Sequence, residues 1–362
     1  VLTVRGCARG CVTCGASNAA FTRFMQAHHP LLRGPEAIAA QARALTAITR
    51  APVFLVGDLT DGGPAYARAV VEALGHTGIT NRIVFEFFEP PPPELLRLID
   101  DVIPHWGAEL SPESHDEAVR ARLGKARYTN AQLEAGIASM MALRCENLDM
   151  FFMVGLPGQS YENVLRMVDV IDDLFQRFDR RLSAYLTPMG PFIDPGSEGF
   201  EHAEAQGYRL RARTLAEHRA LLNDERDWES FLNYSTDLMT RAQIVDATYD
   251  GAERLNALKM KYGRIDAAQG AAVARRMAAA RALRRSLADA GGGALDPTLH
   301  RALLGEIRAF SEATVNDKAE LFPPGAFLRN FRLGGILRLL AREALLNLRR
   351  RPRRAPHAPS IR

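Results

Sequence analysis

The sequence predicts an α/β fold on a parallel sheet, either doubly wound or a partial (βα)6 barrel of TIM type, followed by a helical C-terminal extension. Three observations predict it. Six short apolar runs alternate with six helical patterns between Val1 and Thr187. Polar residues and glycines gather directly after these runs, where the carboxyl ends of parallel strands meet. After Gly207 the pattern is helical throughout.

The candidate strands are short runs rich in β-branched and aromatic residues, bounded by turn residues. They span Val1–Val4, Pro52–Val56, Arg82–Phe88, Trp106–Leu110, Leu148–Val154 and Leu182–Thr187. In either form of the fold, the active site lies at the carboxyl ends of these strands.

The candidate helices lie between the strands, and several open with proline at the first position, where its missing N–H costs nothing. They span Pro35–Ile48, Pro64–Leu74, Pro93–Val102, Asp116–Leu123, Thr129–Met141 and Tyr161–Phe178. Thr129 and Gln132 have the spacing of a capping box.

Three of the four cysteines fall in RGCARGCVTCGAS, residues 5–17. A structural zinc site uses four protein ligands and a disulfide framework an even number of cysteines. A [4Fe–4S] cluster held by three thiolates instead leaves one iron open. Two other interpretations remain, a zinc site completed by His28 or His29 and an electron-transfer cluster completed by Cys145. Cys145 itself is more typical of a buried apolar residue.

Further chemistry-bearing residues follow the other strands, namely Gly57-Asp58, Glu89, Ser111-Pro112-Glu113-Ser114-His115, Gly155-Leu156-Pro157-Gly158 and Thr187-Pro188-Met189-Gly190-Pro191. Glu86 and Glu109 lie inside strands, where an unpaired buried carboxylate is costly. We expect each to bind either a neighbouring strand or a ligand inside the barrel.

Composition narrows the classes of protein. The chain has 362 residues, of which 47% are hydrophobic, and four cysteines, so it is neither disordered nor a disulfide scaffold. No signal peptide precedes the cysteines and no apolar run approaches the roughly 20 residues of a membrane helix, so we expect a cytoplasmic protein. Because the chain opens with the strand-like VLTV, we also expect a further N-terminal segment.

The CxxxCxxC spacing of Cys7, Cys11 and Cys14 resembles the radical S-adenosylmethionine (radical SAM) superfamily. The stretches ELSPESHDEAVRARLGKARYT and FFMVGLPGQSYENV resemble its fourth and fifth strands with the segments that follow them, so the resemblance covers about residues 1–200. It implies a partial (βα)6 barrel, a [4Fe–4S] cluster on the first loop, and SAM across the strand ends. It also implies that SAM chelates the open iron and is cleaved reductively to a 5′-deoxyadenosyl radical.

Carried over by resemblance, Gly57 and Asp58 face the amino group of SAM, Ser111 and Glu113 its ribose and carboxylate, and Gly155 and Leu156 its adenine. The turn at Gly57 departs from the usual Gly-Gly-Glu, and Thr13 stands where an aromatic residue is common. We add Glu86 and Glu109 as cofactor-binding candidates, and Tyr185, Met189 and Asp194 as substrate contacts.

The C-terminal region is expected to be helical over Tyr208–Leu222, from Thr240 with Gln243 as a capping box, and from Asp266 to Leu287. The aromatic residues of WESFLNYSTDLMTR are expected to join the core. The glycines at 291–293 are typical of a linker. We divide the chain into a radical SAM core at 1–200, a helical region at 201–325, and a basic amphipathic helix and tail at 326–362.

The tail is strongly basic. From residue 328 onward it carries ten Arg and one acidic residue, Glu343, whereas the whole chain has a net charge of only +4, so the body is mildly acidic. We expect this helix to pack on the body or on a partner in preference to a membrane surface, and we expect no binding to nucleic acid.

The sequence therefore predicts an enzyme that cleaves SAM to start radical chemistry on a small-molecule substrate, with a reductant such as flavodoxin or ferredoxin. Only Cys145 remains for a second cluster, which disfavours methylthiotransferase chemistry. The motifs VGLPGQS and ESHDEAV resemble the branch with an N-terminal cobalamin domain, which implies cobalamin-dependent methyl transfer. The alternative is a non-catalytic iron–sulfur or zinc protein.

Overall fold

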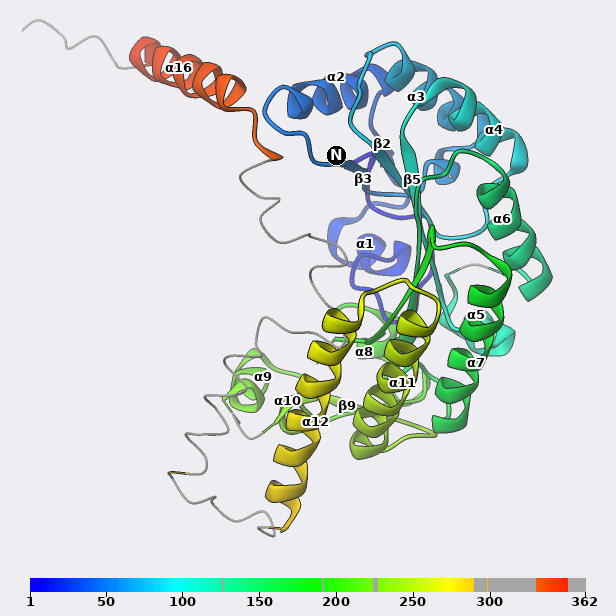
Figure 1. Cartoon of the computed structure of the whole chain (residues 1–362). Helices are drawn as coiled ribbons and strands as arrows, with labels where there is room; N and C mark the ends of the chain where they lie inside the picture. Colours follow the sequence, from blue (N-terminus) through cyan, green and yellow to red (C-terminus); the bar gives the residue numbers. More distant parts are fainter. Residues whose placement is uncertain (126, 191, 224–226, 290–297, 299–329, 351–362) are drawn as a thin grey trace, which may run out of the picture.

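A central sheet of five parallel strands organises the computed structural model, which describes residues 1–125, 127–190, 192–223, 227–289, 298 and 330–350. The strands pair in chain order and the sheet stays open, as expected for a partial barrel (Figure 1). They are β3 (Val53–Leu55), β4 (Ile83–Phe87), β5 (Trp106–Glu113), β6 (Leu148–Val154) and β7 (Leu182–Pro188).

The predicted first strand is wrong as a full strand. Leu2 forms only a parallel bridge with Val56, and the Thr3 amide donates to the Val56 carbonyl at 3.0 Å. The Thr3 carbonyl then accepts from Arg33 instead, and the chain continues as β1 (Val4–Arg5), antiparallel to β2 (Leu31–Leu32). The N-terminal segment thus lies beside β3, at the edge of the five-stranded sheet, for about one residue pair and then leaves the sheet.

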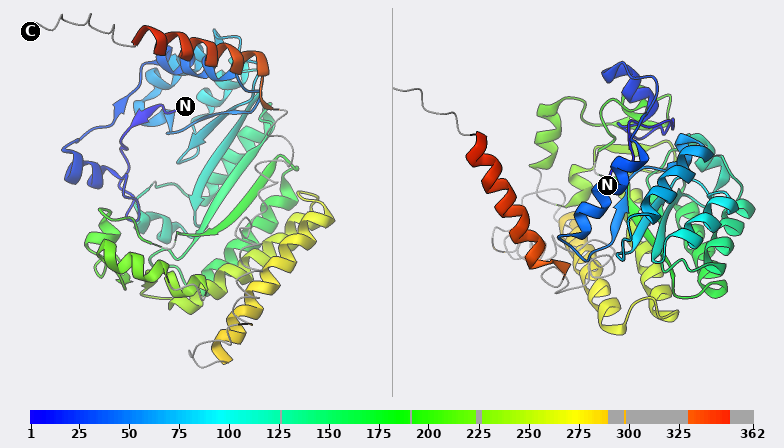
Figure 2. Two further views of the ribbon diagram at one scale, coloured as in Figure 1. Left: turned by 90° about the vertical axis from the view of Figure 1, so that its left-hand side faces the viewer. Right: turned by 90° about the horizontal axis from the view of Figure 1, so that it is seen from above.

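Six helices follow the strands, and each agrees with its predicted range within two residues. They cover the outer face of the sheet (Figures 1 and 2) and span α2 (Pro35–Thr46), α3 (Pro64–Gly75), α4 (Pro93–Val102), α5 (Glu117–Leu123), α6 (Asn130–Ala142) and α7 (Tyr161–Arg177). The capping box of Thr129 and Gln132 is present, and α2, α3 and α4 begin with proline.

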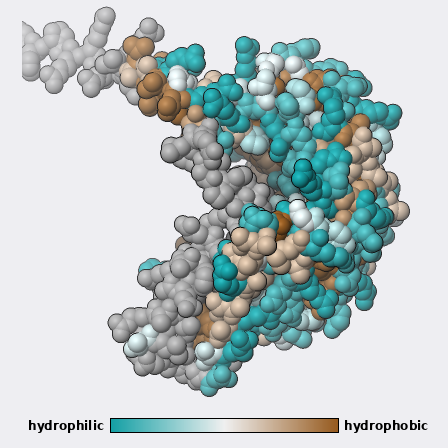
Figure 3. Space-filling model, in the orientation of Figure 1, coloured by the Kyte–Doolittle hydropathy of each residue, from teal (hydrophilic) through white to brown (hydrophobic). Residues whose placement is uncertain are grey.

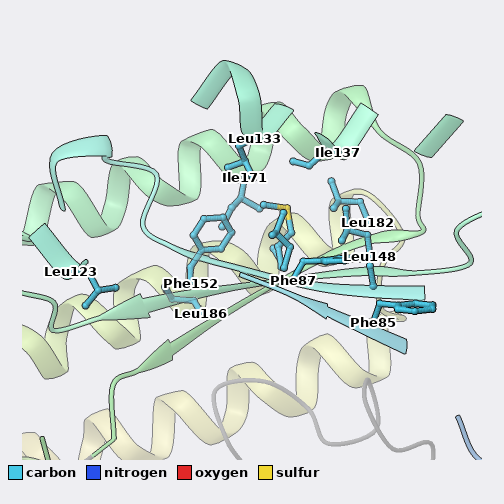
Figure 4. Packing of buried hydrophobic residues seen from close by; sticks show 14 of the residues in the cluster. Phe85, Phe87, Leu123, Leu133, Ile137, Leu148, Phe152, Ile171, Leu182 and Leu186 are labelled. Carbon is cyan, nitrogen blue, oxygen red and sulfur yellow. The ribbon is translucent and has the colours of Figure 1, made fainter. Parts of the chain in front are cut away.

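The core lies between the sheet and these helices. Alternate residues of β6, including Leu148 and Phe152, are buried, while the residues between them are half-buried on the inner face. Phe152 packs beneath Leu133 of α6 and Ile171 of α7 (Figure 4). Full burial of such a side chain stabilises the fold by roughly 1.5–3 kcal/mol, so the outer layer fixes the strands that carry the site.

The prediction of a helix over Tyr208–Leu222 is wrong in its first half. Tyr208–Leu210 form β8, antiparallel to β9 (Tyr234–Thr236), because Gly207 turns at φ 84° and the next helix starts only at its N-cap, Thr214. In this region α8 (Glu198–Glu201) precedes β8, and α9 (Leu215–Leu222) and α10 (Trp228–Phe231) lie between β8 and β9.

Two long helices complete the C-terminal region. The Thr240–Gln243 capping box opens α11 (Arg241–Lys261), and α12 (Ala267–Asp289) follows, so both predictions are confirmed. Gly251 brings α11 close to Leu186, where an added Cβ would lie 2.5 Å from the side chain. In the aromatic segment, Tyr234 and Met239 are buried in the core as expected, whereas Trp228 is half-buried. The predicted linker at 291–293 lies outside the described residues.

Four short helices were not predicted: α1 (Asn18–Met25) after the cysteines, the 3₁₀ turn η1 (Leu59–Gly62) after β3, and α8 and α10 in the C-terminal region. The last described helix is α16 (Leu333–Arg350). Within the described part of the chain, none of the helices combines the length and apolarity needed to cross a bilayer.

Candidate functional site

The cysteine loop connects β1 to α1 at the carboxyl end of the sheet. All three thiols are half-buried and none forms a disulfide. The amide of Arg9 donates to Cys7 Sγ and that of Ala16 to Cys14 Sγ, each at 3.3 Å. Burial raises the pKa of all three thiols, that of Cys11 to about 12, with the Glu113 carboxylate adding to the rise. Metal binding here would therefore release protons.

Segments far away in sequence hold this loop. The Val12 amide donates to the Leu123 carbonyl at 2.8 Å, and the Val12 carbonyl accepts from Gly199 at 2.7 Å. The Gly15 amide donates to Asp194 Oδ2 at 2.9 Å. Figure 2 shows the N-terminal segment (blue) running along the open side of the sheet to the segment after β7 (green). Asp194, predicted as a substrate contact, binds the cysteine loop.

Arg9, inside the loop, was not singled out from the sequence. Its Nε donates to Asp61 Oδ1 at 2.8 Å and its Nη2 to Glu89 Oε1 at 3.0 Å, and the guanidinium lies 6.0 Å from the centre of the Phe88 ring. Asp61 belongs to the turn after β3 and Glu89 to the loop after β4. Arg9 therefore links the cysteine loop to the next two loops of the barrel.

Asp58 is buried and its carboxylate is fully engaged. Oδ1 accepts from the Thr60 amide and hydroxyl at 2.9 and 2.6 Å, and Oδ2 from the Phe88 amide at 2.8 Å. Burial raises the pKa of this carboxyl, although these hydrogen bonds oppose the rise. The neighbouring Gly57 amide donates to Glu86 Oε2 at 2.6 Å, and Gly57 has a φ of 105°. Asp58 and Glu86 thus fix the turn after β3.

Ser111 and Glu113 were expected after the fourth strand, but β5 runs through Glu113. Its pairing with β6 shifts between Leu110 and Glu113, and this irregularity accommodates Pro112, which has no N–H to donate. Glu113 has a φ of 64°. This lies in the left-handed region, where any residue other than glycine is strained. Such strain is typical of functional sites.

Lys125 was missed by the sequence analysis. Its Nζ donates to Glu113 Oε1 and to the Ser111 carbonyl, and it lies 5.0 Å from the centre of the Phe88 ring. Both Glu113 and Lys125 influence the pKa of Cys11, so this ion pair lies beside the cysteine loop. A signal was present, since LGKARYT follows α5 with the only Lys of the first 258 residues.

A small open pocket of about 10 Å³, room for about one water molecule, adjoins this ion pair and is lined by Phe88, Ser111, Pro112, Arg120, Leu123, Lys125 and Tyr128. The Arg120 side chain is buried, donates to the carbonyls of Ser114 and Tyr128 at 2.8 and 3.0 Å, and stacks on the Tyr128 ring. Its Nε finds no hydrogen-bond partner among the described residues. Drug-sized ligands fill roughly 300–1,000 Å³, so this pocket takes no more than one small group, which would meet the positive charges of Lys125 and Arg120.

Gly155 and Leu156 form a buried turn after β6. Gly155 has a φ of 94°, and a Cβ there would lie 2.7 Å from the Tyr234 hydroxyl. Its amide donates to Gln159 Oε1 at 3.0 Å, and its carbonyl accepts from Tyr208 at 3.3 Å. The antiparallel pair of β8 and β9, not predicted from the sequence, therefore covers this turn.

A row of carboxylates crosses the inner face of the sheet. Glu86, Glu109 and Asp149 are register partners on β4, β5 and β6. Burial, followed by the charges of Asp149 and Glu86, raises the pKa of Glu109 to about 7. No hydrogen bond of Glu109 is found within the described residues. Of the two glutamates inside strands, Glu86 alone therefore binds the end of a neighbouring strand there, through the Gly57 amide after β3.

The alternative ligands do not join the cysteine loop. Cys145 precedes β6, at the amino end of the sheet, where it is buried and its thiol donates to the Asn147 carbonyl at 3.2 Å. His28 and His29 are exposed. In the described ranges no three His, Cys, Asp or Glu side chains are arranged to bind one metal ion. A cubane takes each thiolate at a separate iron, so its ligands need not converge on one point.

Residues 1–171 match the family described as the radical SAM superfamily. Among solved structures, the radical SAM methyltransferase TsrM from Kitasatospora setae, with cobalamin and a [4Fe–4S] cluster bound, shares 16% identity at a TM-score of 0.47. The match covers 74% of this chain and 51% of TsrM. The cobalamin-dependent radical enzyme OxsB shares 13% identity at a TM-score of 0.45, over 91% of this chain and 49% of OxsB.

The chain thus spans about half the length of these proteins. None of the curated proteins matches it. The match over residues 1–171, the CxxxCxxC loop and the open parallel sheet agree with one another. Over residues 1–171, a little under half of its length, the chain is similar to the radical SAM superfamily.

Proposed function

We propose that the protein is a radical SAM enzyme whose cluster is held by Cys7, Cys11 and Cys14. One observation carries the proposal: three partly buried, unpaired thiols share one loop that is bound on both sides by other loops of the barrel mouth. Two amides already donate to sulfur, as they would to cluster thiolates. The remaining iron would be open to SAM.

The ion pair of Lys125 and Glu113 beside Cys11, with the small pocket that adjoins it, supports a site for the amino-acid end of SAM. Lys125 and Arg120 supply positive charge for a carboxylate, and the strained Glu113 supplies an acceptor for an ammonium group or ribose hydroxyl. Held by Cys7, Cys11 and Cys14 and reduced by an external donor, such a cluster would supply the one electron that splits a carbon–sulfur bond of SAM into methionine and a 5′-deoxyadenosyl radical.

The other predicted residues would shape the rest of the SAM site. Asp58 and Glu86 hold the turn at Gly57, so we propose that they act on the SAM amino group through the position of that turn. We propose that the turn at Gly155 and Leu156 passes near adenine, and the contacts of Tyr208 and Tyr234 with this turn fix its conformation. Glu109 lies deeper in the barrel, where we propose that it contacts the substrate.

Methyl transfer with cobalamin is the finer proposal. It rests on the resemblance of ESHDEAV and VGLPGQS to the branch with a cobalamin domain. The cobalamin domain itself would have to lie outside residues 1–362. Corrinoid absorbance of the full-length protein from cobalamin-fed cells tests it, and its absence would leave a radical SAM enzyme without cobalamin.

The cluster proposal is tested by anaerobic reconstitution with iron and sulfide. We expect about four irons per chain, lost on replacing Cys7, Cys11 or Cys14 with Ala. Cys145→Ala is the matched control and should retain them. The reduced protein should then cleave SAM to 5′-deoxyadenosine, whereas the alternative, a non-catalytic iron–sulfur or zinc protein, should bind no SAM.

The SAM pocket is tested separately by Lys125→Met. With the cluster intact, affinity for SAM should fall by about tenfold, the effect expected for losing one charged contact of about 1.4 kcal/mol. Lys261→Met, which replaces an exposed lysine of α11 paired with Asp172 of α7, is the control. Unchanged affinity in the Lys125 variant would remove this pocket from the SAM site.

A further inference from the structure

An amphipathic helix leaves the body at the end of the sheet opposite the cysteine loop. The Arg332 amide donates to the Ile48 carbonyl at 2.8 Å, and Gly335 is so close to Ala47 that a Cβ would lie 1.9 Å from its carbonyl oxygen. Ile48 precedes β3, so these contacts fix the start of α16 at the amino ends of the strands. Figure 1 shows the helix extending away from there.

Beyond this start the helix is uncovered. All residues from Leu337 to Leu345 are exposed, and Leu333, Leu337 and Leu340 are 76%, 66% and 60% exposed. At helical spacing these three leucines share one face, and Arg338 and Arg342 lie on the other. Figure 3 shows apolar surface along α16. From Leu337 to Leu345 the helix therefore does not pack on the body, and the expected alternative of packing on a partner stays a prediction.

The chemistry of the helix indicates what covers it. A row of exposed leucines marks an interaction surface. Residues 338–354 contain seven Arg and one acidic residue, which favours an anionic partner. Protein interfaces are enriched in aromatic residues, yet the sequence after Phe331 contains none. Aliphatic residues on one face and Arg on the other are typical of helices that lie in a lipid interface.

We propose that α16 binds the surface of an anionic membrane, with its leucine face in the boundary of the acyl chains and its Arg side chains at the phosphates. The cysteine loop lies at the other end of the sheet, so this orientation leaves the barrel mouth free. The proposal does not depend on the proposed SAM chemistry.

Co-sedimentation of the full chain with vesicles tests it. We expect binding to vesicles of equal parts phosphatidylcholine and phosphatidylglycerol, little binding to phosphatidylcholine alone, and release by salt. Leu340→Gln should weaken binding by about tenfold through lost apolar burial. Leu339→Gln, the same change on a different face, is the matched control and should leave binding unchanged. Arg342→Gln should weaken it by about fivefold.

Three outcomes would overturn the proposal. Equal binding to both kinds of vesicle would show that anionic lipid is not recognised. Equal losses for Leu339→Gln and Leu340→Gln would show that no single face is used. Absent vesicle binding together with a concentration-dependent dimer that Leu340→Gln disrupts would assign the face to a second copy of the chain. Far-ultraviolet circular dichroism checks that each variant keeps its helices.

Discussion

Replacing Arg9 with Gln removes the side chain that joins the cysteine loop to the loops after β3 and β4. The side chains of Arg9 and Asp61 are 14% and 7% exposed, so their interaction is largely shielded from solvent, whereas Glu89 is 37% exposed. A hydrogen bond to a charged group contributes about 1.5–3 kcal/mol when buried, and an exposed ion pair about 0–1 kcal/mol. We therefore expect Arg9→Gln to lower the free energy of unfolding by about 3 kcal/mol.

A double-mutant cycle separates the two partners. Asp61→Asn should couple to Arg9→Gln by about 1–2 kcal/mol, and Glu89→Gln by less than about 0.5 kcal/mol. Urea denaturation of the cluster-free protein, followed by circular dichroism, gives each free energy. In parallel, the Arg9 variant after reconstitution should lose its iron to a chelator faster than the parent.

The reasoning would be refuted by a coupling to Glu89 as large as the coupling to Asp61, because exposure would then not decide which contact matters. A variant with unchanged stability and unchanged iron loss would show that Arg9 does not hold the loop.

The remaining predictions concern the inner face and the turn after β6. Because the folded-state pKa of Glu109 is raised to about 7 from an ordinary value of 4.5, ionisation of this carboxyl costs stability as the pH rises between these values. Glu109→Gln should therefore raise the midpoint of urea denaturation at pH 8 but not at pH 4.5. An equal rise at both pH values would show that ionisation of Glu109 is not the source of the lost stability. Gly155→Ala should destabilise the protein by about 2 kcal/mol, through its positive φ and the contact with the Tyr234 hydroxyl. Adding Tyr234→Phe should cost less in this variant than in the parent, and strictly additive losses would show that the two groups do not meet.

The helices and strands of the core could be predicted because their signals are local. The capping box at Thr129, the prolines that open α2 to α4, and the alternating burial of β6 all depend on residues a few positions apart. The first strand failed because its pairing depends on Arg33, about thirty residues away, which takes the Thr3 carbonyl from the sheet.

The contacts around the cysteine loop were out of reach for the same reason. The cysteine spacing indicates the chemistry, but Arg9 meets its partners 52 and 80 residues later, and Gly15 meets Asp194 179 residues later. Helical spacing likewise predicted the amphipathic α16 but could not say which surface, if any, lies against it. The strand conformation of Ser111–Glu113 was also not predicted, because a proline indicates the end of a strand unless the strand pairing is irregular.

The distant anchors of the cysteine loop set an order of events during synthesis. The three cysteines leave the ribosome early, whereas Asp194 and Gly199, which bind Gly15 and Val12, follow about 180 residues later. At a synthesis rate of about 5–20 residues per second, the delay is roughly 10–40 s. For that time the nascent thiols have neither their hydrogen-bonded shape nor the shelter of the loop after β7. They are then at their most reactive toward oxygen and stray metal ions, and the loop gains its final form only once the whole barrel has emerged.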